Sequence, residues 1–260
     1  MNSFRDTLRR TKLRLLQLHH DANCGHIGGN FSCIDALMTL HHRVMGPEDR
    51  FVLSKGHSAG ALYATLWSLG RLSEEDLKTF TRDNSLLPGH PSGSGIPGLM
   101  FSTGSLGHGP SLAAGLALAA RHKGSEHRVF CLCSDGEWQE GSCWEALNFA
   151  IHQRLDNLTI LIDQNGLQGF GRTADVISCS DLSPRISAFG AEVMKIDGHD
   201  TVAIASAMAR PTNGLPRVLV LDTTKGRGLH FEDKLESHYL PLSEENYQAA
   251  RSLLEQETPR

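Results

Sequence analysis

Two short motifs in this chain place oxygen-bearing side chains at the ends of apolar runs. Ser-Asp-Gly at 134–136 follows HRVFCLC, and Asp-Gln-Asn-Gly at 163–166 ends LTILI. If both runs are parallel strands, Asp135 and Asn165 lie at one edge of a sheet, where open α/β folds bind ligands. A carboxylate, an amide oxygen and a nearby carbonyl suit Mg²⁺, and Gly136 lets a diphosphate approach the backbone. Either motif alone is more typical of a simple turn.

Composition and charge exclude several classes of function. The net charge of −4, with Lys and Arg scattered along the chain, argues against nucleic acid as a partner. No apolar run approaches the roughly 18 to 20 residues that span a bilayer, and the charged N-terminus lacks a signal peptide's apolar centre. We therefore expect a cytoplasmic protein with no membrane partner. The six cysteines, at 24, 33, 131, 133, 143 and 179, show no zinc-type spacing and are interpreted as buried, reduced thiols.

Apolar runs alternate with segments of helical periodicity, which predicts an α/β fold with a parallel β-sheet flanked by helices on both faces. The strand candidates are 50–54, 127–133, 158–163, 192–197 and 217–222. The last four are nearly continuous apolar runs, which are typical of strands covered on both faces. Helices are predicted at 4–19, 32–43, 57–69, 108–121, 140–153, 181–189 and 200–209, and Ser73 with Asp76 indicates a capping box. Residues 1–260 are expected to form one domain, with a functional loop at 84–108.

The stretch from 134 to 173 resembles the thiamin diphosphate motif of the transketolase family, which begins with Gly-Asp-Gly and ends with Asp-Asn-Gly or Asn-Asn. Ser134 replaces the first Gly of that motif, and because Ser is small we expect the metal site to survive. The resemblance covers nearly the whole chain in the family's order. Its further segments are NCGHIGG (23–29), FVLSKGHSAGALYA (51–64), LPGHPSGSGIPGLMFSTGSLGHGPSLAAGLALAA (87–120), MKIDGHD (194–200) and DTTKGRGL (222–229).

The resemblance implies roles for particular residues. Thiamin diphosphate would be bound by His57, Gly104, Leu106, Asp135, Gly136, Glu137 and Asn165. Mg²⁺, or another divalent cation such as Ca²⁺ or Mn²⁺, would be held by Asp135, Asn165 and the backbone carbonyl of Leu167. His26, His90 and His238 would be catalytic, because imidazoles hydrogen-bond sugar hydroxyls and move protons near neutral pH. At His238 the chain reads ESHYLPL where the family has Trp-His-Gly.

Other polar residues receive weaker roles. Glu140 and Glu145 match two family glutamates at a subunit boundary that join a proton relay between active sites, although each also fits an ordinary solvated helix carboxylate. His108 replaces a Gln of the family and is expected near the cofactor without a catalytic duty. Seven further histidines are interpreted as surface or helix residues: His19, His20, His41, His42, His122, His127 and His152.

The resemblance also implies a partner, because a full transketolase is more than twice this length and adds a pyrimidine-binding and a C-terminal domain. We expect this chain to be the N-terminal subunit of a split enzyme, an α2β2 complex whose second chain carries those domains. Such an enzyme moves a two-carbon ketol unit from a ketose or ketose phosphate to an aldehyde. Two alternatives stay open: another thiamin enzyme, 1-deoxyxylulose phosphate synthase-like or 2-oxoacid decarboxylating, and a non-catalytic regulatory subunit.

Overall fold

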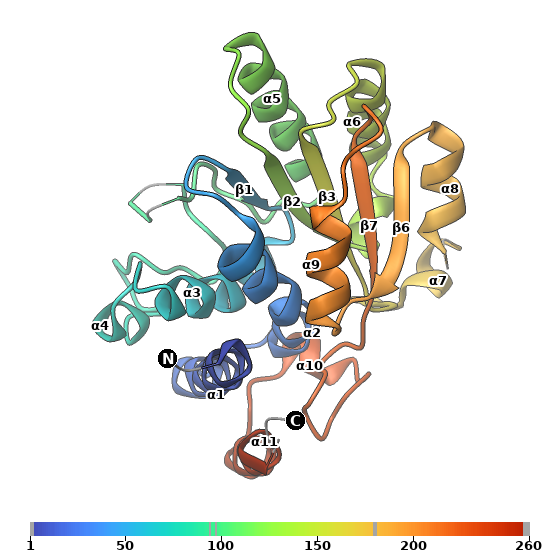
Figure 1. Ribbon diagram of the computed structural model, residues 1–260. Coiled ribbons are helices and arrows are strands. Elements are labelled where there is room, and N and C mark those ends of the chain that lie inside the picture. The colour runs from blue at the N-terminus through green and yellow to red at the C-terminus, as the bar shows by residue number, and fades with distance from the viewer. Residues whose placement is uncertain (1–2, 94, 97, 179–180, 257–260) are drawn as a thin grey trace.

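The computed structural model describes residues 3–93, 95–96, 98–178 and 181–256. Its centre is a five-stranded sheet in the order β1-β2-β3-β7-β6, and every neighbouring pair is parallel (Figure 1). The strands are β1 (Arg50–Leu53), β2 (Val129–Ser134), β3 (Leu158–Gln164), β6 (Glu192–Asp197) and β7 (Arg217–Asp222). The predicted parallel α/β sheet is confirmed, and each predicted strand is present within a few residues of its expected bounds.

Helices cover both faces of the sheet because side chains of its central strands alternate between two apolar clusters. Phe130 and Leu132 of β2 join one cluster, whereas Cys131 and Cys133 join the other. The first cluster is completed by α1 (Phe4–Ala22), α2 (Ile27–Thr39), α3 (Ala59–Ser68), α9 (Thr201–Ala209) and α11 (Glu244–Gln256). The second is completed by α5 (Gly109–His122), α6 (Gly141–His152) and α8 (Leu182–Phe189).

Short elements connect the layers. They are the π-helical turn η1 (Leu40–Val44), the 3₁₀ turns η2 (Gly56–Ser58) and η3 (Gly136–Gln139), the helices α4 (Glu74–Leu77), α7 (Thr173–Val176) and α10 (Glu236–Tyr239), and a hairpin of β4 (Leu167–Gln168) with β5 (Gly171–Arg172). The capping box of Ser73 and Asp76 is confirmed at the start of α4. The described residues of 84–108 form no helix or strand, as expected for a loop.

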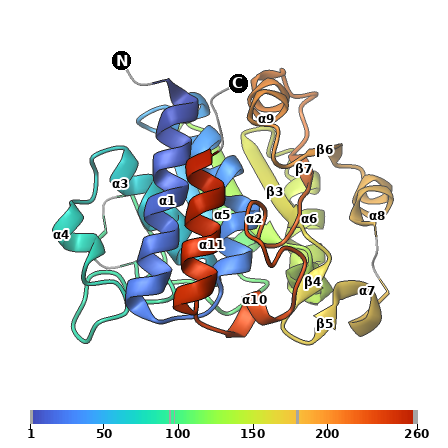
Figure 2. The same ribbon diagram turned by 90° about the horizontal axis from the view of Figure 1, so that it is seen from below.

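Two elements differ from the sequence expectation. Strand β6 was expected to be covered on both faces, but it is an edge strand and most of its residues are only partly buried. Helix α11 was not predicted, because its sequence is mainly polar. It lies beside α1 (Figure 2), where Tyr247, Ala250 and Leu254 provide a narrow apolar stripe at helical spacing.

Two further expectations from the sequence concern the cysteines and the membrane. The five described cysteines are free; four are buried and Cys24 is partly buried, while Cys179 lies outside the described residues. Within the described ranges, every helix is either too short or too polar to cross a membrane.

Candidate active site at the carboxyl edge of the sheet

The carboxyl ends of the strands bring five polar segments to one edge of the sheet. Ser54 and Lys55 follow β1, Asp135 follows β2, and Asn165 follows β3. The segment after β7 runs through Thr223 and Thr224 to Lys225, and the turn after β6 contains His199. Since parallel strands all end at the same edge, residues far apart in the sequence meet here.

Asp135 and Asn165 are held in defined orientations. Asp135 Oδ2 accepts hydrogen bonds from the backbone N of Gly166 (2.8 Å) and from Thr173 Oγ1 (3.2 Å), and Oδ1 accepts one from Gly136 N (2.8 Å). Asn165 Oδ1 accepts from Leu167 N (3.1 Å). Burial and the nearby charge of Asp163 raise the pKa of Asp135 to about 6. Because its ionised form is costly here, a bound cation would stabilise this carboxylate.

A buried ion pair lies next to Asn165. Lys55 and Asp163 are paired with both side chains fully buried, and Asp163 Oδ2 also accepts from Asn165 Nδ2 at 3.2 Å. The hydroxyls of Ser32 and Thr223 complete the hydrogen bonds of this carboxylate. Lys55 Nζ donates in addition to Gly29 O at 3.0 Å. A buried charge is tolerated only when it is paired and hydrogen-bonded, and this pair meets both conditions.

A second lysine reaches the edge from the segment after β7. Lys225 Nζ donates to the backbone carbonyl of Leu167 at 3.0 Å and lies 3.1 Å from His238 Nδ1. Burial and the charge of Lys55 lower the pKa of Lys225 to about 8. The described groups around Lys225 therefore compensate its charge only in part, and the site suits an anionic group.

Four predicted histidines gather beside this edge. The ring of His26 lies 4.9 Å from that of His238, 5.7 Å from that of His57 and 5.9 Å from that of His90, measured between centroids. The rings of His57 and His238 are also 5.9 Å apart. His26 has a left-handed backbone (φ 67°), and its Nδ1 atom is buried without a hydrogen-bond partner among the described residues.

The environment keeps these imidazoles neutral. Burial is the main cause that lowers the pKa of each, from the ordinary value near 6.5. Lys225 adds to the effect at His238, whose pKa falls to about 3, and Lys55 adds to it at His57. A neutral imidazole offers one donor and one acceptor, which suits contacts with hydroxyl and carbonyl groups.

The fully buried Asn30 fixes two of the histidine segments, and no sequence motif had pointed to it. Its Nδ2 atom donates to the backbone carbonyls of His26 (2.7 Å) and His57 (3.1 Å). Its Oδ1 atom accepts from Ala61 N at 2.7 Å. One side chain thus joins the start of α2 to the segment that precedes α3.

The glycine-rich turn is tied to the strand ends through Glu137. This carboxylate accepts from Gly107 N (2.8 Å), from Ser134 N (3.2 Å) and from the hydroxyl of Ser54, and it is fully buried. Glu137 therefore anchors the turn that contains Gly104 and Leu106. A Cβ atom on Gly104 would lie 2.9 Å from the ring of His90, so this glycine lets the His90 loop approach.

Gly136 is equally tight: a Cβ atom there would lie 2.4 Å from Gln168 Oε1. The remaining predicted residues lie elsewhere. Glu140, which directly precedes α6, and Glu145 within it are exposed, and the structure does not bring them into the histidine cluster. His108 is exposed, and its Nδ1 atom lies 3.1 Å from Ser105 O.

Sequence reasoning missed the supporting residues of the site. Lys55 and Lys225 stand in the motifs SKGH and TTKG, and Asp163 begins the predicted Asp-Gln-Asn-Gly end of β3. The available signal was the position of these residues in short segments that contain glycine, serine or threonine. A lone lysine or aspartate in a sequence is usually an exposed residue, and only the fold shows that these three are buried.

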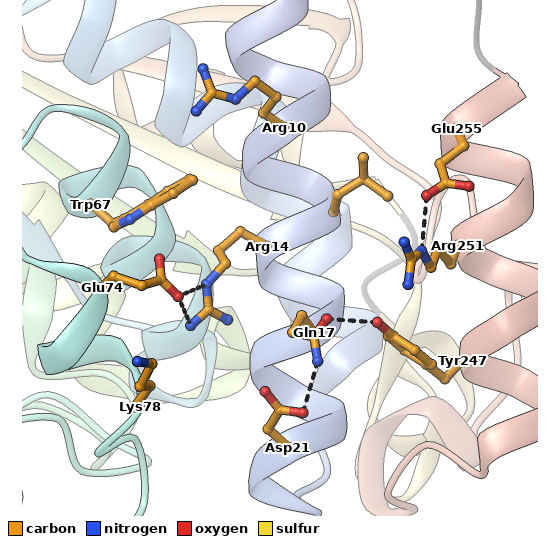
Figure 3. A pocket seen from close by; sticks show the side chains of 11 residues that line it. Arg10, Arg14, Gln17, Asp21, Trp67, Glu74, Lys78, Tyr247, Arg251 and Glu255 are labelled. Atoms are coloured by element: carbon orange, nitrogen blue, oxygen red, sulfur yellow. Dashed lines mark hydrogen bonds and ion pairs between the residues drawn. The ribbon is translucent and has the colours of Figure 1, made fainter.

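A separate groove of about 440 Å³ runs along α1 and is bordered by residues of α3, α4 and α11 (Figure 3). Its charged side chains are mostly paired with each other: Arg14 Nη2 lies 2.6 Å from Glu74 Oε1, and Arg251 Nε lies 2.8 Å from Glu255 Oε1. None of the predicted site residues lines this groove. The candidate site is therefore the strand edge.

A family model and several relatives of known name match most of this chain. The family model described as "Transketolase, thiamine diphosphate binding domain" matches residues 9–259. An apulose-4-phosphate transketolase subunit of Phocaeicola vulgatus is 36% identical over 259 residues, which cover 95% of this chain and 92% of that protein. The 6-deoxy-6-sulfo-D-fructose transketolase subunit SqwG of a Clostridium species is 40% identical over 245 residues, covering 90% and 89%.

Among solved structures, transketolase from Leishmania mexicana superposes with a TM-score of 0.92 at 28% identity, and the match covers 100% of this chain but 42% of that one. Transketolase from Campylobacter jejuni gives a TM-score of 0.85 at 32% identity, with 98% and 43% covered. The chain therefore spans less than half the length of these transketolases.

Proposed function

This chain belongs to the transketolase family, whose thiamine diphosphate-binding domain it matches, and we propose that it is one subunit of a two-component transketolase. The enzyme would transfer a two-carbon ketol unit from a ketose or ketose phosphate to an aldehyde. The observation that carries this proposal is the meeting of Asp135 and Asn165 with Lys225 and four neutral histidines at one sheet edge.

The edge fits thiamin diphosphate together with a divalent cation. Asp135, whose buried carboxylate is costly without a cation, would hold Mg²⁺, Ca²⁺ or Mn²⁺ with Asn165 and the carbonyl of Leu167. Lys225, whose charge is only partly compensated, is a suitable neighbour for the diphosphate. His57, Gly104, Leu106, Gly136 and Glu137 are proposed to bind or shape the cofactor site. When bound, the cofactor would supply the nucleophilic carbon for attack on the ketose carbonyl.

The histidines would hydrogen-bond the sugar and transfer protons. We assign His26, His90 and His238 to the substrate side, where neutral imidazoles hydrogen-bond the hydroxyls of the sugar and orient its carbonyl. A ring of this kind accepts the proton that leaves a donor hydroxyl as the carbon–carbon bond breaks, and returns it when the acceptor adds. The low pKa of His238 favours the hydrogen-bonding role for that ring, because protonating it is costly.

The partner would be a separate C-terminal chain with the pyrimidine-binding domain, in an α2β2 complex in the cytoplasm, while residues 1–260 form the diphosphate domain. Two relatives that this chain covers almost completely are named as subunits of transketolases, which supports this proposal. Exposed aromatic side chains on α6 and α8 support a partner surface: Phe149 is 42% exposed and Phe189 is 44% exposed. Glu140 lies just before α6 and Glu145 lies within it. Both would join a proton relay between active sites across this subunit boundary.

Reconstitution tests the proposal. The chain is purified alone and with a candidate C-terminal subunit, and ketol transfer is measured at saturating thiamin diphosphate and Mg²⁺ with a panel of ketose and ketose phosphate donors. We expect transfer only from the complex. Turnover by this chain alone would contradict the two-component proposal, and 2-oxoacid decarboxylation without ketol transfer would contradict the transketolase activity.

A further inference from the structure

A partly buried chain of hydrogen bonds leads from α1 to the segment that carries Lys225. Lys12 Nζ in α1 lies 2.8 Å from Asp35 Oδ1 in α2. The other carboxylate oxygen, Asp35 Oδ2, lies 3.0 Å from His199 Nδ1 in the turn after β6. His199 Nε2 then accepts the backbone N–H of Thr224 at 3.0 Å. These four residues come from four different parts of the fold.

The contacts define the protonation of His199. Because the backbone N–H of Thr224 is always a donor, Nε2 must be the unprotonated nitrogen. The ring proton is therefore on Nδ1, from which it is donated to Asp35. A second proton on Nε2 would place two donors face to face and break the contact with Thr224.

Lys12 pairs with the same carboxylate as His199. Here the ammonium of Lys12 already neutralises Asp35, which is only 2% exposed, and the side chains of Lys12 and His199 are 12% and 14% exposed. Burial alone would raise the pKa of Asp35, but Lys12 and His199 hold it below its ordinary value. Asp35 thus remains an acceptor for both partners.

Thr224 directly precedes Lys225, whose Nζ atom reaches the carbonyl of Leu167 and the ring of His238. The same segment is fixed on its other side by Gly226 N, which donates to Gly28 O at 2.9 Å. We propose that Asp35 and His199 are positioning residues that hold the backbone of Lys225 in register with the diphosphate site. Because that register matters only if the edge binds a diphosphate, the role of His199 rests on the proposed function.

Two substitutions of His199 distinguish the effect of a lost hydrogen bond from the effect of a changed side-chain shape. His199→Phe keeps a ring of similar size but offers no acceptor to Thr224, whereas His199→Gln keeps a carbonyl oxygen that can accept this N–H. Binding of thiamin diphosphate with Mg²⁺ is measured by calorimetry on the reconstituted complex. The Phe variant loses the contacts with both Asp35 and Thr224, but only the contact with Thr224 reaches the Lys225 segment directly. We therefore expect it to bind about 2- to 10-fold more weakly, the range that one hydrogen bond gives, and the Gln variant to recover most of the affinity.

The protonation of His199 is measured on the unaltered chain. In ¹⁵N-histidine spectra, with His199 assigned from the signals that the Gln variant lacks, the Nδ1–H form is expected. The Nε2–H form or an imidazolium at pH 7.5 would overturn the proposal, as would a Phe variant that binds the cofactor as tightly as wild type. A wild-type complex that fails to bind thiamin diphosphate would instead contradict the proposed function itself.

Discussion

Lys55 and Asp163 form an ion pair in which both side chains are fully excluded from solvent. Lys55 comes just after β1 and Asp163 lies in β3, so the pair ties two strand ends together across β2. Burial alone would raise the pKa of Asp163, but the Lys55 ammonium and the hydroxyls of Ser32 and Thr223 hold it below its usual value. Asp163 therefore stays ionised and accepts a hydrogen bond from Asn165.

Lys55→Met should leave the buried Asp163 carboxylate without its counter-charge. We expect the free energy of unfolding to fall by about 3–5 kcal/mol, as for other buried pairs that lose one partner. Urea denaturation of the single variant and of Lys55→Met/Asp163→Asn tests this expectation. The double variant should be more stable than the single one, and equal stability would show that the ion pair is not the cause.

Asp135→Ala should weaken binding of thiamin diphosphate and Mg²⁺ by more than about 10-fold, because residues that merely orient metal ligands already contribute that much. The matched control is Asp156→Ala, which removes an exposed carboxylate before the other end of β3. Calorimetry on the reconstituted complex measures both. Unaltered affinity of the Asp135 variant would refute its assignment as a metal ligand.

His26→Ala and His90→Ala should spare the cofactor and impair the chemistry. Both rings belong to the histidine cluster, whereas the side chains of Asp135 and Asn165 are hydrogen-bonded to other groups. We expect kcat/KM for the donor to fall by on the order of 10²–10⁴, the usual contribution of a positioned proton-transfer group. Steady-state kinetics and calorimetry are compared on the same samples. Wild-type turnover in both variants would exclude a catalytic role for these histidines.

Phe149→Glu should weaken the complex with the C-terminal subunit, because a charge would replace an exposed aromatic ring on the helix that carries Glu145. Val202→Glu is the control, since Val202 is 62% exposed on α9, which packs against the opposite face of the sheet. Analytical ultracentrifugation or calorimetry gives both affinities. If the Val202 variant dissociates and the Phe149 variant does not, the partner binds the other face.

The buried His19 and the partly buried His41 should make the protein less stable in acid. Burial lowers the pKa of His19 to about 4, and burial with the charges of Arg71 and His42 lowers that of His41 to about 3. Below pH 6.5 the unfolded chain gains protons that the folded chain refuses, so this stability is present above pH 6.5 and is lost as pH falls towards 4.

Denaturation at pH 7 and pH 5 measures how much His41 contributes to the loss of unfolding free energy in acid. His41→Phe should reduce the loss of unfolding free energy between these values by about 2 kcal/mol. Exposed His152→Phe should leave the loss unchanged, because that side chain is in water in both states. Comparing variants also cancels the opposite trend expected from Asp135, whose pKa is raised. Identical acid sensitivity of wild type and His41→Phe would contradict the prediction.

The sequence predicted the parts of the site that local patterns encode. An apolar run followed by a polar residue places Asp135 at a strand end without knowledge of the fold, and capping at Ser73 is equally local. Contacts between distant residues could not be predicted in this way. Lys55 and Asp163 are separated by 108 positions, and Lys12 meets Asp35 only because α1 packs against α2. Helix α11 was missed because its apolar stripe has meaning only beside α1.

Asn30 has a consequence for any attempt to redesign this pocket. Since one amide holds the backbone carbonyls of both His26 and His57, the two loops do not form independent modules. A library that varies residues 23–29 while keeping 55–60 fixed would disturb both rings at once. Loop grafts from a relative with a different donor should therefore transfer both segments together with the residue at position 30.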